Sequence, residues 1–289
     1  MQEFNFLRPK TLTELIEILA DTRGCILAGG TDISPTMRRA QFTARILLDI
    51  SEIDELRFVR MQDQRIHIGS LSTHQELATS PILSLYNPAL VASALTIGCE
   101  QTRNRGTLGG NIANASPAAD TIPSLMIFDA TLHLLSKSGE RTIKIDEFLV
   151  SPGKTKLNPD ELIHSVSFEP LTDAWGVSFM KLGKRNGMVI SVVSASSAVV
   201  LDQEGRIKIS RICLGSVAPR VVRSPNAEEF LIDQLPTKEI LDNAAHICIG
   251  DIAPISDIRS TADYRKHAAI VLTRRVLEQS VDHAYRRIL

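Results

Sequence analysis

One stretch of this chain limits the possible fold more than any other, because it is long, polar and made of small residues. It runs from Glu100 to Asp120 and contains three glycines among Asn, Ser, Thr and Ala side chains. Side chains of this kind bury little apolar area, so we interpret the stretch as an irregular loop rather than a core element. Long loops in compact domains usually carry function, and we therefore predict that this one binds a ligand.

Glycine pairs occur both in this stretch and near the N-terminus. Gly109 and Gly110 lie inside the stretch, and Gly29 and Gly30 follow the apolar run 25–27. A glycine pair lets backbone N–H groups approach a ligand and form an anion-binding nest, although a single pair after a strand is more often a simple turn. Two such pairs predict one ligand that carries more than one phosphate and is held from both sides.

Length and charge exclude several classes of protein. At 289 residues the chain is long enough for more than one domain. Its 32 basic and 33 acidic side chains give a net charge of −1, without the basic excess typical of nucleic-acid binding. The first residues lack the basic and apolar regions of a secretory signal, and no apolar run is long enough to span a membrane. We expect a cytoplasmic protein with no nucleic-acid partner and no membrane span.

Common catalytic and metal-binding motifs are missing from the sequence. The four cysteines, at positions 25, 99, 213 and 248, lie far apart, and the seven histidines are scattered, so we predict no metal site. No G-x-G-x-x-G follows a strand, and no P-loop, G-x-S-x-G or H-E-x-x-H motif occurs. We assign no catalytic residue, and a dinucleotide ligand would require a fold other than the Rossmann fold.

Hydrophobic periodicity predicts a mixed order of strands and helices, with a change of pattern near residue 172. The predicted strands cover 4–8, 25–28, 45–50, 56–61, 65–69, 131–136, 141–145, 162–169, 176–182, 189–201 and 207–215. The predicted helices begin at residues 12, 73, 88, 122, 227, 237 and 261.

Several motifs of the sequence resemble those of a known family. Residues 28–32, 101–104, 107–114 and 116–120 are similar to the two FAD motifs of the FAD-binding subunit of molybdenum hydroxylases. This is the medium-subunit family of xanthine dehydrogenase and carbon monoxide dehydrogenase. The similarity covers essentially the whole chain, and it extends to residues 8–11, 48–50, 68–69, 181–185 and 218–220.

The resemblance implies an α+β fold of the PCMH-type FAD-binding class. Two FAD-binding subdomains would precede a C-terminal domain of three antiparallel strands and helices. The expected boundaries are residues 1–55 for an N-terminal α/β subdomain, 56–172 for an α+β subdomain, and 173–289 for the C-terminal α+β domain.

The resemblance also implies a set of residues that contact non-covalently bound FAD. The backbone around the two glycine pairs would hold the diphosphate, with Thr31 or Thr107 adding a hydroxyl. Asp120 would accept from ribose or other hydroxyls, and Lys181 would lie beside the isoalloxazine, where a cation stabilises the reduced flavin. Without the resemblance, Lys181 would be interpreted as a solvated lysine at a strand edge. The full set is Ile26, Leu27, Ala28, Gly29, Gly30, Thr31, Asp32, Thr107, Gly109, Gly110, Asn111, Asp120 and Lys181.

By the same resemblance the chain is expected to be an electron-transfer subunit of a hetero-oligomer, with a dimer of heterotrimers as one form. A partner subunit would carry the molybdenum cofactor and another the [2Fe–2S] clusters, and the flavin would pass electrons to NAD⁺, a quinone or dioxygen. Two alternatives stay open at this stage. One is a free-standing PCMH-type flavin oxidase, and the other is an assembly subunit that has lost its flavin.

Overall fold

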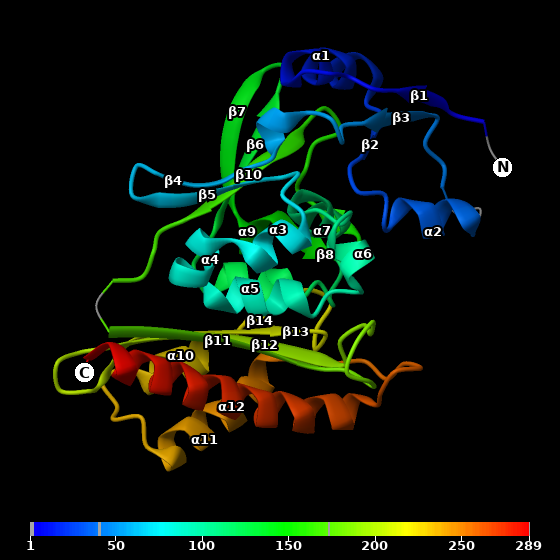
Figure 1. Cartoon of the computed structure of the whole chain (residues 1–289). Coiled ribbons are helices and arrows are strands. Elements are labelled where there is room, and N and C mark those ends of the chain that lie inside the picture. Colours follow the sequence, from blue (N-terminus) through cyan, green and yellow to red (C-terminus); the bar gives the residue numbers. More distant parts are fainter. Residues whose placement is uncertain (1–2, 40–41, 173, 289) are drawn as a thin grey trace.

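The computed structural model describes residues 3–39, 42–172 and 174–288. Within these residues the chain forms a three-stranded, a five-stranded and a four-stranded sheet, and a two-stranded ribbon (Figure 1). The three larger sheets follow one another along the sequence. Their buried apolar residues form three clusters, one of which joins the second sheet to the C-terminal sheet. The predicted α+β architecture is confirmed. The exact boundaries of the three predicted domains stay a prediction, and residue 173 lies outside the described residues.

The first sheet is parallel, with the strand order β1-β3-β2. Helix α1 (Leu12–Thr22) begins at its N-cap Thr11 and packs Leu15 and Leu19 onto the buried strand residue Leu48. The remaining elements of this unit are β1 (Asn5–Leu7), β2 (Cys25–Leu27), α2 (Ile33–Arg38), β3 (Ile46–Asp49) and the 3₁₀ helix η1 (Asp54–Leu56). Because parallel strands end at the same edge of a sheet, β2 delivers the first glycine pair to that edge.

The second sheet is antiparallel, with the strand order β4-β5-β10-β6-β7. Its strands are β4 (Val59–Gln62), β5 (Arg65–Gly69), β6 (Thr131–Ser136), β7 (Gly139–Lys144) and β10 (Leu162–Phe168). Short helices fill the connection between β5 and β6, namely α3 (His74–Thr79), α4 (Pro81–Tyr86), α5 (Pro88–Leu95), α6 (Glu100–Arg103), α7 (Leu108–Asn114) and α8 (Thr121–Met126). Helix α9 (Ile145–Phe148) and the ribbon of β8 (Leu149–Ser151) and β9 (Lys154–Thr155) precede β10.

The expectation of an irregular loop over residues 100–120 is wrong, because this stretch contains the helices α6 and α7. Thr107 caps α7, and its side chain accepts a hydrogen bond from the N–H of Gly110. Leu108 and Ile112, four residues apart on one face, are fully buried. Two leucine-sized side chains and a good N-cap are therefore enough to fold a glycine-rich segment as a helix.

The C-terminal sheet is covered on both faces. In Figure 1 it lies between α5 on one side and the long helix α12 (Ala262–Ile288) on the other. All residues of the central strand β12 (Val193–Leu201) are buried, as expected for a strand with packing on both sides. Its neighbours are β11 (Ala174–Leu182) and β13 (Ile207–Gly215).

The structure adds a fourth strand to the three predicted for this sheet. The strand β14 (Val222–Arg223) is only two residues long and pairs with Cys213 and Leu214, too short to leave a periodic pattern in the sequence. The other C-terminal elements are α10 (Pro225–Leu231), α11 (Lys238–Ile247) and η2 (Cys248–Asp251). Among the helices that the structure describes, none has the length and apolarity needed to cross a membrane.

The packing of α12 on β11 gives a testable prediction. A Cβ atom on Gly176 would overlap the backbone of Ser280 and Ala284 in α12, so Gly176→Ala should push helix and sheet apart. We expect the free energy of unfolding to fall by about 1–3 kcal/mol, as for other overpacked cores. Chemical denaturation followed by circular dichroism measures it. Gly250→Ala is the control, since no atom lies within 4 Å of its Cβ position; equal stability of the two variants would contradict this packing.

Candidate cofactor-binding site

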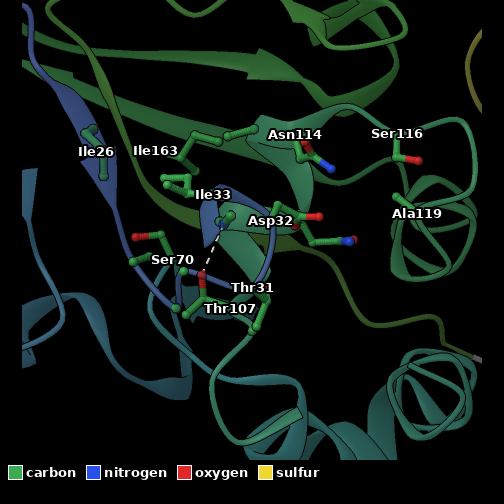
Figure 2. Close-up of a pocket in the computed structure, with 18 of the residues that line it drawn as sticks. Ile26, Thr31, Asp32, Ile33, Ser70, Thr107, Asn114, Ser116, Ala119 and Ile163 are labelled. Atoms are coloured by element: carbon green, nitrogen blue, oxygen red, sulfur yellow. Dashed lines mark hydrogen bonds between the residues drawn. The ribbon is translucent and has the colours of Figure 1, made fainter. Parts of the chain in front are cut away.

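A cavity of about 740 Å³ lies where the three units of the fold meet. Its walls come from the N-terminal sheet and the loop after β2, from the segments before and within α7, and from the ends of β10 and β11. This volume is typical of a site for a large cofactor. Figure 2 shows Thr31 and Asp32 from the first loop, with Ser70 and Thr107 from the segments that face it.

The structure brings together nearly all residues predicted for the site. Leu27 is the exception: it does not line the cavity, and its carbonyl accepts a hydrogen bond from the N–H of Ile50 at 3.0 Å. The predicted residues that line the cavity are Ile26, Ala28, Gly29, Gly30, Thr31, Asp32, Thr107, Gly109, Gly110, Asn111, Asp120 and Lys181. The structure shows that these residues line the cavity. Their individual contacts to a cofactor stay predictions.

The loop after β2 offers backbone N–H groups to the cavity. Among the described residues, no acceptor bonds the N–H groups of Gly29, Gly30, Thr31 or Asp32. Gly30 has a φ of +74°, a left-handed conformation that favours glycine. A Cβ atom on Gly29 would overlap the carbonyl oxygen of Arg105, so this glycine allows the two segments to touch. Adjacent unpaired amides of this kind are suited to an anion.

The second glycine pair does not offer amides in the way the sequence predicted. The N–H of Gly109 bonds the carbonyl of Ser70 at 2.8 Å, and the N–H of Gly110 bonds the Thr107 hydroxyl at 3.2 Å. A Cβ atom on Gly109 would lie 2.6 Å from the Ser70 Cβ, whereas one on Gly110 would meet only Thr107, at 3.0 Å. Gly109 thus allows close packing within the chain, and Gly110 leaves a bare surface toward the cavity.

A third wall of the cavity escaped the sequence analysis. The segment from Ser70 to His74 follows β5 and pairs with the start of α7. The N–H of His74 bonds the Gly106 carbonyl at 2.9 Å, and the N–H of Leu108 bonds the Ser72 carbonyl at 2.9 Å. Nothing in the local sequence signals this pairing, because its two sides lie far apart in the chain. The cavity wall near Thr155, Asn158 and Ile163 was also missed.

His74 is the buried imidazole of this third wall. Its side chain lines the cavity, and the residue is only 3% exposed. Burial, together with the positive charge of Arg103, lowers the pKa of His74 from 6.5 to about 4. The ring is therefore neutral at physiological pH.

In another part of the cavity wall, Asp120 and Lys181 form a buried ion pair. The Lys181 Nζ lies 2.6 Å from the Asp120 Oδ2 and donates a second hydrogen bond to the Thr96 carbonyl at 3.1 Å. The hydroxyl of Ser191 donates to the other oxygen of Asp120. Burial raises the pKa of Asp120, and Lys181 and Ser191 oppose that rise. Lys181 is thus no solvated strand-edge lysine, since its side chain is 8% exposed.

These features fit an elongated ligand with an anionic centre. Unpaired amides and a side-chain-free surface at Gly110 suit a diphosphate, and the residues that line the cavity include both Ile163 and Lys181. The residues present therefore fit FAD, which carries a diphosphate between two ring systems.

Comparisons with known proteins agree with this geometry. Residues 2–170 match the family model of the FAD-binding domain in molybdopterin dehydrogenase, and residues 178–280 match the carbon monoxide dehydrogenase flavoprotein C-terminal domain. A putative xanthine dehydrogenase FAD-binding subunit of Escherichia coli K12 is 31% identical over 280 residues, 96% of each chain. Subunit alpha of the 6-hydroxypseudooxynicotine dehydrogenase complex of Paenarthrobacter nicotinovorans is 31% identical, covering 97% of this chain and 95% of its own.

The fold is shared with a solved structure of the same group. A chain of carbon monoxide dehydrogenase from Hydrogenophaga pseudoflava superposes with a TM-score of 0.93 at 28% identity, over 98% of both chains. The family models together cover most of the sequence, and the relatives match along nearly their whole length. The chain therefore belongs to the FAD-binding subunits of the molybdenum hydroxylase family, the flavoproteins of xanthine and carbon monoxide dehydrogenases, and is an FAD-dependent oxidoreductase subunit.

Proposed function

We propose that this chain is the electron-transfer subunit of a molybdenum-containing hydroxylase or dehydrogenase, and that it binds FAD non-covalently. A partner subunit holds the molybdenum cofactor, and a second partner holds [2Fe–2S] clusters that deliver electrons to this chain. The final acceptor is NAD⁺, a quinone or dioxygen. When bound, FAD supplies the redox chemistry, and the protein supplies its placement and electrostatic environment.

The single observation that carries the proposal is the set of unpaired amides opposite Gly110. Four N–H groups, from Gly29 to Asp32, lack an acceptor in this described loop. Such groups bind phosphate oxygens through charge-assisted hydrogen bonds, each of which is stronger than a neutral one. The bare surface of Gly110 lets the diphosphate approach α7 without a steric obstacle.

Lys181 and Asp120 add an electrostatic element to the cavity wall. Because Asp120 and the Thr96 carbonyl both accept from Lys181, the ammonium group is fixed in position rather than mobile. A fixed positive charge next to a cofactor favours its electron-rich form. We infer that Lys181 lies beside the isoalloxazine and that Asp120 orients Lys181, in addition to any contact with cofactor hydroxyls.

The need for partners is supported by the relatives and by the site itself. The relative from Paenarthrobacter nicotinovorans is named as a subunit of a dehydrogenase complex, and the superposed structure is named as a carbon monoxide dehydrogenase that lacks the Mo-pyranopterin moiety of the molybdenum cofactor. Among the described residues, no group of three or more His, Cys, Asp or Glu side chains is arranged to hold a metal ion. Metal centres in the reaction would therefore be bound by other subunits.

Replacing Gly110 by valine tests the cofactor site. The added side chain would occupy the surface assigned to the diphosphate, so we expect the affinity for FAD to fall by about 100-fold, or about 3 kcal/mol. The measurement is the visible flavin spectrum of the purified chain, followed by titration of the flavin-free chain with FAD.

Two further variants make this test specific. Gly250→Val, placed where no atom lies within 4 Å of the Cβ position, should keep its yellow colour. Gly109→Ala should instead lower the melting temperature of the flavin-free chain, because its Cβ would clash with Ser70. Normal flavin content in Gly110→Val would show that the diphosphate lies elsewhere.

Isolation of the native assembly tests the proposed partners. An affinity-tagged chain, purified from its own organism, should bring down subunits that contain molybdenum and iron as well as FAD. Elemental analysis and the absorption spectrum report these contents. A monomeric yellow chain that oxidises a small substrate by itself would contradict the proposal and support the free-standing oxidase.

A further inference from the structure

His74 lies at a junction of the cavity walls. It is the first residue of α3, directly after Thr73, which forms a capping box with Glu76. Its backbone N–H bonds the Gly106 carbonyl, and the neighbouring Arg105 carbonyl is the group that touches Gly29. The imidazole is therefore next to the contact between the segment before α7 and the loop with unpaired amides.

The ring is held against the backbone of Gly106. A Cβ atom on Gly106 would lie 3.0 Å from the His74 Cδ2 and 3.4 Å from its Nε2. The Nδ1 atom is fully enclosed and has no hydrogen-bond partner. The Nε2 atom likewise has no partner among the hydrogen bonds of the described residues, but it is not one of the fully enclosed atoms. Because His74 is one of the residues that line the cavity, Nε2 is the ring nitrogen more open to a ligand.

The position of the ring proton follows from this asymmetry. A neutral imidazole carries one N–H and one bare nitrogen. A buried N–H without an acceptor is rarer in proteins than an unsatisfied acceptor, so the enclosed Nδ1 is the bare nitrogen. The proton is then on Nε2, where it is a hydrogen-bond donor directed into the cavity.

We propose that His74 anchors the cofactor by donating a hydrogen bond from Nε2 to an oxygen of the FAD diphosphate. The inference rests on the proposed FAD site and adds a residue from the third wall to it. A neutral donor suits this position, because it contacts an anion without placing a second buried charge close to Arg103. Three chain segments, rather than two, would then hold the diphosphate.

Three substitutions at position 74 test this role. A glutamine places an amide N–H close to the position of the imidazole Nε2, whereas an asparagine places one near Nδ1 and a leucine has no donor. A hydrogen bond to a charged group corresponds to a change in affinity of about 10–100-fold. We expect His74→Leu and His74→Asn to weaken FAD binding by about that factor, and His74→Gln to stay within about threefold of the wild type.

The measurements are the dissociation constant for FAD, from quenching of flavin fluorescence, and the melting temperature of each flavin-free chain. Riboflavin, which lacks the diphosphate, is the matched ligand, and its affinity should be the same for His74→Leu and the wild type. A wild-type chain that fails to bind FAD would refute the proposed function itself.

Three results would overturn the inference alone. The first is a wild type and a His74→Leu chain with equal affinity for FAD. The second is a His74→Gln chain that loses as much affinity as His74→Leu. The third is a His74→Leu chain that loses affinity for riboflavin and FAD alike. The last two would reflect a structural effect of the substitution.

Discussion

The site depends on contacts between backbones that leave no room for a side chain. At Gly29 the loop after β2 touches the Arg105 carbonyl, and at Gly109 the start of α7 touches Ser70. A larger residue at position 29 would separate the N-terminal unit from the second unit, and one at position 109 would separate two segments within the second unit. Glycines are therefore needed in the cavity wall because they allow two backbone segments to touch, and not only because they allow unusual backbone angles. This explains why the two glycine pairs lie so far apart in sequence and still serve one site.

The two pairs nevertheless have different tasks. Hydrogen bonds from Leu108 and Gly109 fix α7 against the Ser70–His74 segment, and the N–H of Gly110 bonds the N-cap residue Thr107. The amides from Gly29 to Asp32 are left without acceptors. Gly29, Gly30 and Thr31 are half-buried and Asp32 is exposed, so these amides can hydrogen-bond water until a ligand replaces it. The fold thus stabilises one side of the cavity internally and leaves the other side to be completed by the cofactor.

Sequence reasoning predicted the fold class and named residues that, except for Leu27, line one cavity. Two different kinds of argument led to these residues. The glycine pairs indicated an anion site from residue chemistry alone, whereas the assignments of Asp120 and Lys181 came from resemblance to the family. Their mutual ion pair was not anticipated, because it joins α8 to β11 across the chain. The helical form of residues 108–114 was missed for a related reason. Its stability comes from tertiary burial of Leu108 and Ile112, and not from the propensity of its glycines.

Residues of the third wall lay beyond any local pattern. Ser70 and His74 are ordinary turn and helix-start residues in the sequence, and only the long-range pairing with residues 106–109 brings them to the cavity. Binding sites at the junction of several units are hard to predict from sequence for this reason, since each segment of the wall looks like a simple connecting loop when considered alone. Capping motifs and hydrophobic periodicity were enough to predict most of the helices and strands. How these elements meet around the cavity could be seen only in the structure.

The most direct test of this account compares FAD with riboflavin as ligands of the flavin-free wild-type chain. The central claim is that backbone amides around Gly29 and Gly30 hold the diphosphate, and charge-assisted hydrogen bonds contribute roughly 1.5–3 kcal/mol each. Isothermal titration calorimetry should therefore give an affinity for FAD at least about 100-fold above that for riboflavin. Equal affinities would show that the amides do not bind the diphosphate and would contradict the account.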